Sequence, residues 1–172
     1  MQIMLNTAQI QSDLDQNTKD FLAMLASFGP EKFSLKPSET AWSPAEVADH
    51  VLQVMAFSNL AMRGNSVPTE RPFDEKLKVI RDSMASRTAS YKSPEMALPR
   101  KGPILQSEII MKLKAQRELM LETVAGSDLS LFCADLKHPG FGGLTRFEWI
   151  QFDIHHTQRH MRQLENIAGL AG

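Results

Sequence analysis

Apolar residues recur every three or four positions over four long stretches of the chain, a pattern typical of amphipathic helices that pack through one face. The stretches cover residues 6–28, 43–62, 106–125 and 146–167. The first shows the pattern clearly, and its apolar positions are Ile10, Leu14, Phe21, Leu22, Leu25 and Phe28. Gly29-Pro30 then ends this helix.

Two of the predicted helices begin with a recognisable capping motif. Ser43 is a favourable N-cap, Pro44 suits the first helical position, and Glu46 completes a capping box. Thr145 and Glu148 have the same spacing at the start of the last helix. These motifs fix the start of each helix and therefore which side chains share a face.

Residues 65–105 are the least regular part of the chain. They are expected to hold a short helix near residues 74–88, followed by a loop in the proline-rich stretch SPEMALPRKGP. Long connections of this kind are either functional or required by the topology. This connection is long enough to cross a bundle, which would let the second and third long helices run parallel.

Four long helices with little that resembles a strand predict an all-α fold, a four-helix bundle. No repeat, low-complexity tract or linker divides the chain, so residues 1–172 are expected to form a single domain. No apolar run approaches the ~20 residues of a membrane span. The N-terminal residues do not resemble a signal peptide, and with one cysteine no internal disulfide framework is expected.

The charge is nearly balanced, with a formal net charge of -1. Neither a nucleic acid nor an anionic membrane is therefore expected as a partner. A cytoplasmic location is the default expectation for such a composition.

Histidines interrupt the apolar stripes of two predicted helices. In DIHHTQRHMRQLENI, residues 153–167, His156 and His160 lie one helical turn apart on the broad apolar stripe. His155 points about 100° away, toward water or a boundary. His50 lies on the stripe of the second helix, where an aliphatic residue would pack better. Burying an unpartnered polar group costs about 1–3 kcal/mol, so three such groups are expected to share a partner.

A divalent metal is one such partner. Three neutral imidazoles suit Zn, Ni, Fe or Co and leave at least one coordination position open. The alternative is that the histidines form hydrogen bonds to neighbouring carboxylates and bind no metal. Spacing alone leaves both readings open.

Two blocks of sequence resemble the DinB/YfiT-like family of metal-binding four-helix bundles. The first is AWSPAEVADHV, with a tryptophan ahead of the second helix and a histidine two turns into it. The second is HPGFGGLTRFEWIQFDIHHTQRHMRQL, which has an HP-x-x-G-x-L-T lead-in, an E-W pair and an H-x-x-x-H-x-x-Q helix. Residues 65–105 carry no motif of this family.

The resemblance implies an up-down-down-up bundle and a metal triad of His50, His156 and His160. Some members of that family are thiol-dependent enzymes, namely bacillithiol S-transferases and the mycothiol-dependent maleylpyruvate isomerase. In those enzymes the metal is thought to bind and activate the thiol of the cofactor. The resemblance therefore implies a divalent metal (Zn, Ni or Fe) and a low-molecular-weight thiol as cofactors here.

Several residues near the triad have alternative interpretations. Asp153 is a candidate base or a hydrogen-bond acceptor for a ligand histidine, or it pairs with Arg146 or another basic residue. Gln163 either orients His160 or ties two helices together, and the second role is favoured. His138 either reaches the rim of the site or serves a turn, and a turn is favoured. Cys133 is expected to be a small buried residue.

Two functions remain open from the sequence. One is a metal-dependent enzyme, a thiol-dependent S-transferase or a hydrolase, acting on a small molecule. The other is a non-catalytic bundle stabilised by metal, serving in binding or interaction. A structural zinc site normally has four protein ligands, and only three recur here, which favours an open site unless Asp153 closes it. The expected partner is a small-molecule substrate or thiol, and the resemblance to the DinB/YfiT-like family also implies a second copy in a homodimer.

Overall fold

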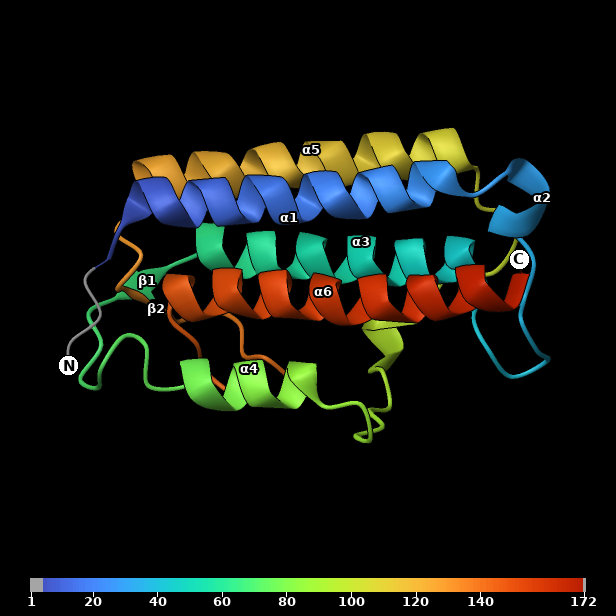
Figure 1. The fold of residues 1–172 in the computed structure, drawn as a ribbon. Helices are drawn as coiled ribbons and strands as arrows, with labels where there is room; N and C mark the ends of the chain where they lie inside the picture. The colour runs from blue at the N-terminus through green and yellow to red at the C-terminus, as the bar shows by residue number, and fades with distance from the viewer. Residues whose placement is uncertain (1–4, 172) are drawn as a thin grey trace.

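Four long helices lie side by side and form the body of the molecule (Figure 1). The computed structural model describes residues 5–171. The long helices are α1 (Thr7–Ser27), α3 (Pro44–Arg63), α5 (Gln106–Gly126) and α6 (Arg146–Ala171). The predicted four-helix bundle is confirmed, and the main difference is that α6 continues beyond residue 167.

The helices follow an up-down-down-up course. Figure 1 shows α3 and α5 running in the same direction, while α1 and α6 run in the opposite one. Helix α1 packs against α5 and α6, and α3 packs against the same two helices. The connection between α3 and α5 returns along the whole bundle, so the parallel arrangement that its length allowed is observed.

This connection carries two helical elements outside the bundle. Helix α4 (Leu77–Ala85) packs along α6, and the single 3-10 turn η1 (Glu95–Ala97) packs against α3. Helix α4 is shorter than the sequence suggested, and η1 falls within the stretch expected to be a loop. A further single turn, α2 (Pro30–Phe33), lies between α1 and α3.

A small antiparallel sheet, which the sequence did not predict, joins the end of α3 to the lead-in of α6. Its strands are β1 (Ser66–Val67) and β2 (Phe132–Cys133), and Ser66 lies opposite Cys133. Strands of two residues are too short to show an alternating pattern, so the sequence carries no signal for them.

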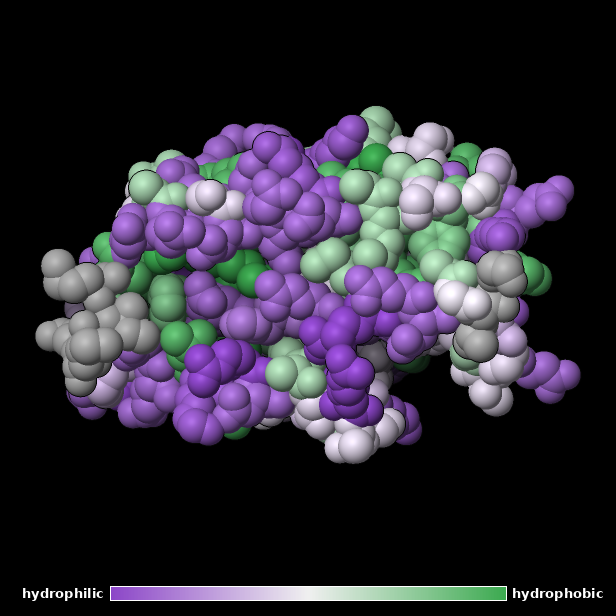
Figure 2. Space-filling view, viewed as in Figure 1, coloured by the Kyte–Doolittle hydropathy of each residue, from purple (hydrophilic) through white to green (hydrophobic). Residues whose placement is uncertain are grey.

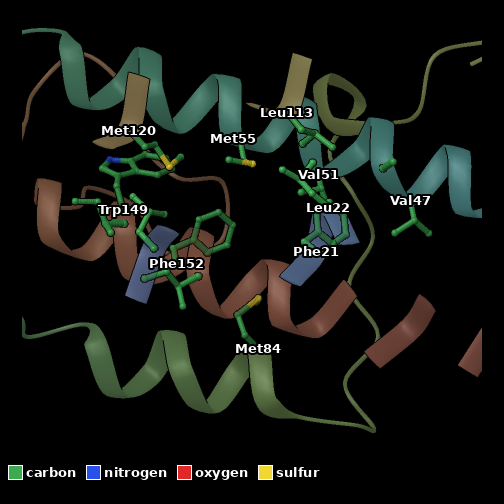
Figure 3. Close-up of a cluster of buried hydrophobic side chains, with 14 of the residues drawn as sticks. Phe21, Leu22, Val47, Val51, Met55, Met84, Leu113, Met120, Trp149 and Phe152 are labelled. Atoms are coloured by element: carbon green, nitrogen blue, oxygen red, sulfur yellow. The ribbon is translucent and has the colours of Figure 1, made fainter. Parts of the chain in front are cut away.

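The interior of the bundle is apolar. Figure 3 shows Phe21, Leu22, Val51 and Leu113 gathered together, with Trp149 beside Met120 further along the bundle. Met84 of α4 lies at the edge of this cluster, below α6. Contact between buried apolar side chains of all four long helices is what holds the bundle together.

Both predicted capping boxes are present. Ser43 Oγ accepts a hydrogen bond from the backbone N–H of Glu46, which accepts one in return from the N–H of Ser43. Thr145 and Glu148 make the same exchange at α6. Each box sets the register of a helix that carries part of the histidine cluster. No helix within residues 5–171 is long and apolar enough to cross a bilayer.

Candidate metal centre

His50, His156 and His160 meet between α3 and α6, as the proposed triad requires. The Nε2 atom of His156 lies 3.1 Å from Nε2 of His50 and 3.1 Å from Nε2 of His160. One nitrogen from each ring falls within 4.8 Å of the other two. All three side chains are buried, with exposed fractions of 4%, 7% and 8% in chain order.

Helix register brings these side chains together. His50 lies between Val47 and Val51 on the inward face of α3, and both valines are fully buried. On α6, His156 and His160 are separated by one turn, so their rings project from the same side. Since α3 and α6 pack directly against each other, the two sets of side chains meet at their contact.

The hydrogen bonds of the Nδ1 atoms of His50 and His160 show that the Nε2 atoms of these two rings carry lone pairs. His50 Nδ1 lies 2.6 Å from the carbonyl oxygen of Ala97, and His160 Nδ1 lies 2.8 Å from Oε1 of Gln163. A carbonyl oxygen can only accept, so each of these Nδ1 atoms carries the proton and each Nε2 is an acceptor. His156 Nε2 could donate to at most one of the two. Hydrogen bonding within the cluster therefore leaves at least one buried acceptor unsatisfied.

A divalent metal fits this set of donors. Ligands about 2.0 Å from a tetrahedral zinc ion lie about 3.3 Å apart, close to the 3.1 Å between the neighbouring nitrogens. Burial lowers the pKa of His50, and it lowers the pKa of His160 to about 3. Burial and the two neighbouring imidazoles hold the pKa of His156 well below its usual range. The imidazoles are thus neutral at pH 7, the state in which they bind metals.

The cluster lies in the wall of a large cavity. The cavity has a volume of about 1310 Å³ and is bounded by α3, α4, α6, the segment of residues 86–98 and the loop that begins at His138. All three histidines line it. Within the described residues, no fourth His, Cys, Asp or Glu joins the cluster. A metal held by the triad would therefore keep a position open toward the cavity.

Residues 97–100 are pinned to α3 beside His50 by three further polar contacts. Asp49, only 1% exposed, accepts a hydrogen bond from the backbone N–H of Arg100 and pairs with its guanidinium at 2.7 Å. Gln53 donates to the carbonyl oxygen of Leu98 at 2.6 Å. These contacts hold the Ala97 carbonyl against His50. Sequence reasoning missed them, because a main-chain acceptor has no signature in the sequence.

Asp153 makes neither of the contacts expected of it. Arg146 donates instead to the main-chain oxygens of Met62 and Asp128, so the expected ion pair is wrong. Within residues 5–171, Nδ1 of His156 has no hydrogen-bond partner, so Asp153 does not form the expected bond to this ligand histidine. Burial raises the pKa of Asp153 well above its usual range. Its role as a base stays a prediction.

Other expectations had mixed outcomes. Gln163 orients His160, so the favoured role of tying two helices together is wrong. His138 serves the turn, as expected, because its Nδ1 accepts from the N–H groups of Gly140 and Phe141, and its ring also lines the cavity. Cys133 is fully buried, and burial raises the pKa of its thiol to about 11. His155 is half-buried and bonds to Gln158, in agreement with its predicted boundary position.

Known proteins are similar to this chain in sequence and in fold. A family model described as the DinB superfamily matches residues 13–164. The chain is 31% identical over 145 residues to "Uncharacterized protein YuaE" of Bacillus subtilis (strain 168), covering 83% of this chain and 87% of that protein. Its fold is similar to that of "TT2238, a four-helix bundle protein", with a TM-score of 0.59, 23% identity, and coverage of 94% of this chain and 99% of that one. The family match extends over most of the chain, which therefore belongs to the DinB superfamily.

Proposed function

We propose that this protein is a metal-dependent enzyme of the thiol-dependent S-transferase or hydrolase type, acting on a small molecule. One observation carries the proposal: three imidazole nitrogens converge in the wall of a cavity of about 1310 Å³. A structural zinc site normally closes its coordination shell with four protein ligands. A three-ligand site facing a cavity is the arrangement of catalytic sites.

Some residues at the site would bind the metal ion, and others would position these ligands. His50, His156 and His160 would hold a divalent ion such as Zn, Ni, Fe or Co, with Ala97 and Gln163 fixing two of the rings. When bound, such an ion supplies a Lewis acid that lowers the pKa of a thiol or a water at its open position.

The enclosing side chains would orient the substrate and limit its access to water. Trp42 lies against His50 with ring centroids 5.0 Å apart, and Phe152 lies against His156 at 5.2 Å. These aromatic rings give the neighbourhood of the triad apolar walls. Electrostatic interactions inside such a site are stronger than in water, because the local dielectric constant is lower.

The test compares metal content and turnover in the wild type and in His156→Ala. Protein purified without a chelator or an affinity tag should hold about one equivalent of metal, and the variant should hold none. Transfer of small thiols to an electrophilic acceptor and hydrolysis of an activated ester should both be assayed. Turnover that survives complete removal of the metal would rule out the proposed mechanism.

A purely structural metal would give a different result. The ligands come from α3 and α6, so an ion bound there would also cross-link these two helices. A large fall in melting temperature on chelation, without turnover and without any change in a cobalt spectrum on adding thiols, would favour the non-catalytic role. Retained melting temperature with lost turnover would favour the enzyme.

A further inference from the structure

The wall of the cavity beyond the triad is rich in positive charge. Arg87, Lys92, Arg159 and Arg162 line it, and Glu165 is the one acidic side chain among its lining residues. The wall thus has an excess of three positive charges, in a chain whose formal net charge is -1. Basic residues are therefore concentrated around the cavity, while the rest of the molecule is acidic.

These four cations are not neutralised by carboxylates. Among residues 5–171, none of them lies within ion-pair distance of an Asp or Glu side chain. Arginines elsewhere usually do have such a partner, as is the case for Arg63, Arg71, Arg81, Arg100 and Arg117. The difference indicates that the cavity keeps its positive charge available for a ligand.

Two of the arginines are held in place by main-chain carbonyl oxygens. Arg159 donates to the carbonyls of Ser86 at 2.7 Å and Ala89 at 2.6 Å, and its guanidinium lies 5.1 Å from the centre of the Tyr91 ring. Arg162 donates to the carbonyl of Met84 at 2.7 Å. Neutral acceptors orient a guanidinium without cancelling its charge, and each arginine keeps further N–H donors for another group.

Two of the cations, Arg159 and Arg162, lie on α6 with His156 and His160, and the other two lie in the segment that follows α4. Arg159 comes three residues after His156 and directly before His160, and Arg162 comes two residues after His160. Figure 2 shows strongly hydrophilic side chains gathered where α6 meets the segment that follows α4. A ligand of modest size could therefore reach the triad with one end and these cations with the other.

We propose that the cavity binds a small anionic molecule whose carboxylate or phosphate group is held by Arg87, Lys92, Arg159 and Arg162, while its reactive end lies at the triad. This inference rests on the proposed function, because it assigns the class of substrate that the metal centre acts on. Guanidinium groups bind carboxylates and phosphates with two parallel hydrogen bonds, which gives them geometric preference for such groups.

The first experiment compares three thiols that differ in carboxylate number. Cobalt-loaded protein is titrated with 2-mercaptoethanol, 3-mercaptopropionate and mercaptosuccinate, and the sulfur-to-cobalt absorption gives each dissociation constant. Affinity should rise with each added carboxylate, and the gain should shrink at high salt, because exposed charges are screened. Succinate and inorganic phosphate are titrated by calorimetry to show which anionic group the wall prefers.

The second part removes the charges. Arg162→Gln should weaken mercaptosuccinate binding about tenfold and leave 2-mercaptoethanol unaffected, as expected for one lost charge-assisted hydrogen bond. The double variant Arg87→Gln/Lys92→Gln should weaken mercaptosuccinate binding about fivefold. Both side chains are exposed, so the substitutions should not impair folding. The control is Arg63→Gln, which removes the same charge outside the cavity and should change nothing.

The outcomes separate the two proposals. Equal affinity for the three thiols, or equal losses for charged and uncharged thiols in the variants, would overturn the anionic site while thiol binding at the metal stands. If no thiol binds, the proposed thiol chemistry fails, and succinate and phosphate decide the anionic site alone. If succinate or phosphate binds to the wild type and this binding is lost in the variants, the anionic site is supported. If neither anion binds to the wild type, the anionic site is overturned.

Discussion

The amide oxygen of Gln163 lies 2.8 Å from Nδ1 of His160, one turn earlier on α6. The same spacing recurs between His155 and Gln158, where the two atoms are 3.2 Å apart. Of the two histidines, only His160 belongs to the triad. The two pairs therefore offer a matched comparison of the same contact with and without a role at the site.

Replacing Gln163 by Ala should weaken metal binding about 10- to 100-fold, because His160 loses the acceptor that fixes its tautomer and orientation. Gln163→Glu keeps an acceptor and should retain the affinity. Competition with a chromophoric chelator measures both. Gln158→Ala is the control, and an equal loss in that variant would contradict the role given to Gln163.

Arg71, which is partly buried, forms an ion pair with the fully buried Glu148 that should contribute strongly to stability. Glu148 is fully buried and receives two hydrogen bonds from the Arg71 guanidinium, at 2.8 and 2.6 Å. Arg71→Met would leave a buried carboxylate without its charge partner and should lower the free energy of unfolding by about 3–5 kcal/mol. Urea unfolding measures this change.

The control for this prediction is Arg63→Met. Arg63 and Glu122 lie 3.6 Å apart with exposed fractions of 49% and 67%, so their pair should contribute at most about 1 kcal/mol. If Arg71→Met and Arg63→Met lowered the free energy of unfolding by similar amounts, the contact of Arg71 with Glu148 would stabilise the fold no more than an exposed pair does.

His138 should make the metal-free protein less stable in acid. Burial, and then the nearby Lys76, lower the pKa of His138 to about 4, below its usual value of 6.5. Between these values the unfolded chain binds more protons than the folded one, so stability is full above pH 6.5 and is lost as the pH falls toward 4. The contribution of one such group is up to about 1.4 kcal/mol per pH unit.

The variant His138→Asn isolates this effect from that of the triad. An asparagine oxygen can replace Nδ1 as the acceptor for Gly140 and Phe141 but does not titrate. Urea unfolding of chelated protein at several pH values should therefore show a smaller loss in the variant than in the wild type. Parallel curves would contradict the prediction.

Asp153 should destabilise the metal-free protein at neutral pH. Burial raises its pKa well above the usual 3.8, so the folded state retains a proton that the unfolded chain releases. Stability should therefore fall as the pH rises above 3.8, and Asp153→Asn should melt at a higher temperature than the wild type at pH 7. The advantage should shrink near pH 4, and a lower melting temperature of the variant at pH 7 would refute this account.

The sequence predicted the parts of the fold that depend on local patterns. The apolar stripes gave the four long helices, and the residues at Ser43 and Glu46 and at Thr145 and Glu148 gave two of their starts, because N-cap chemistry lies within one turn of the chain. The convergence of His50 with His156 could also be predicted, because both histidines lie on helix faces that point into the bundle, where the two helices meet.

The rest depended on contacts between distant segments. The acceptor for His50 is a main-chain oxygen of Ala97, and every residue type supplies that atom. The partner of Glu148 comes from Arg71 in a connection without any regular pattern. The role of Gln163 could not be predicted for a different reason. A polar side chain on a helix can reach either a neighbouring helix or its own preceding turn, and spacing does not distinguish the two.

The parallel course of α3 and α5 has a consequence for how this protein could diversify. Two parallel neighbours cannot be joined by a tight hairpin, so the chain must spend a long segment returning to its starting end. Here that segment supplies one side of the cavity, while both histidine-bearing helices belong to the bundle. Insertions or deletions at residues 86–94 would therefore alter which molecules enter without disturbing the triad, so selectivity could change while the chemistry is conserved.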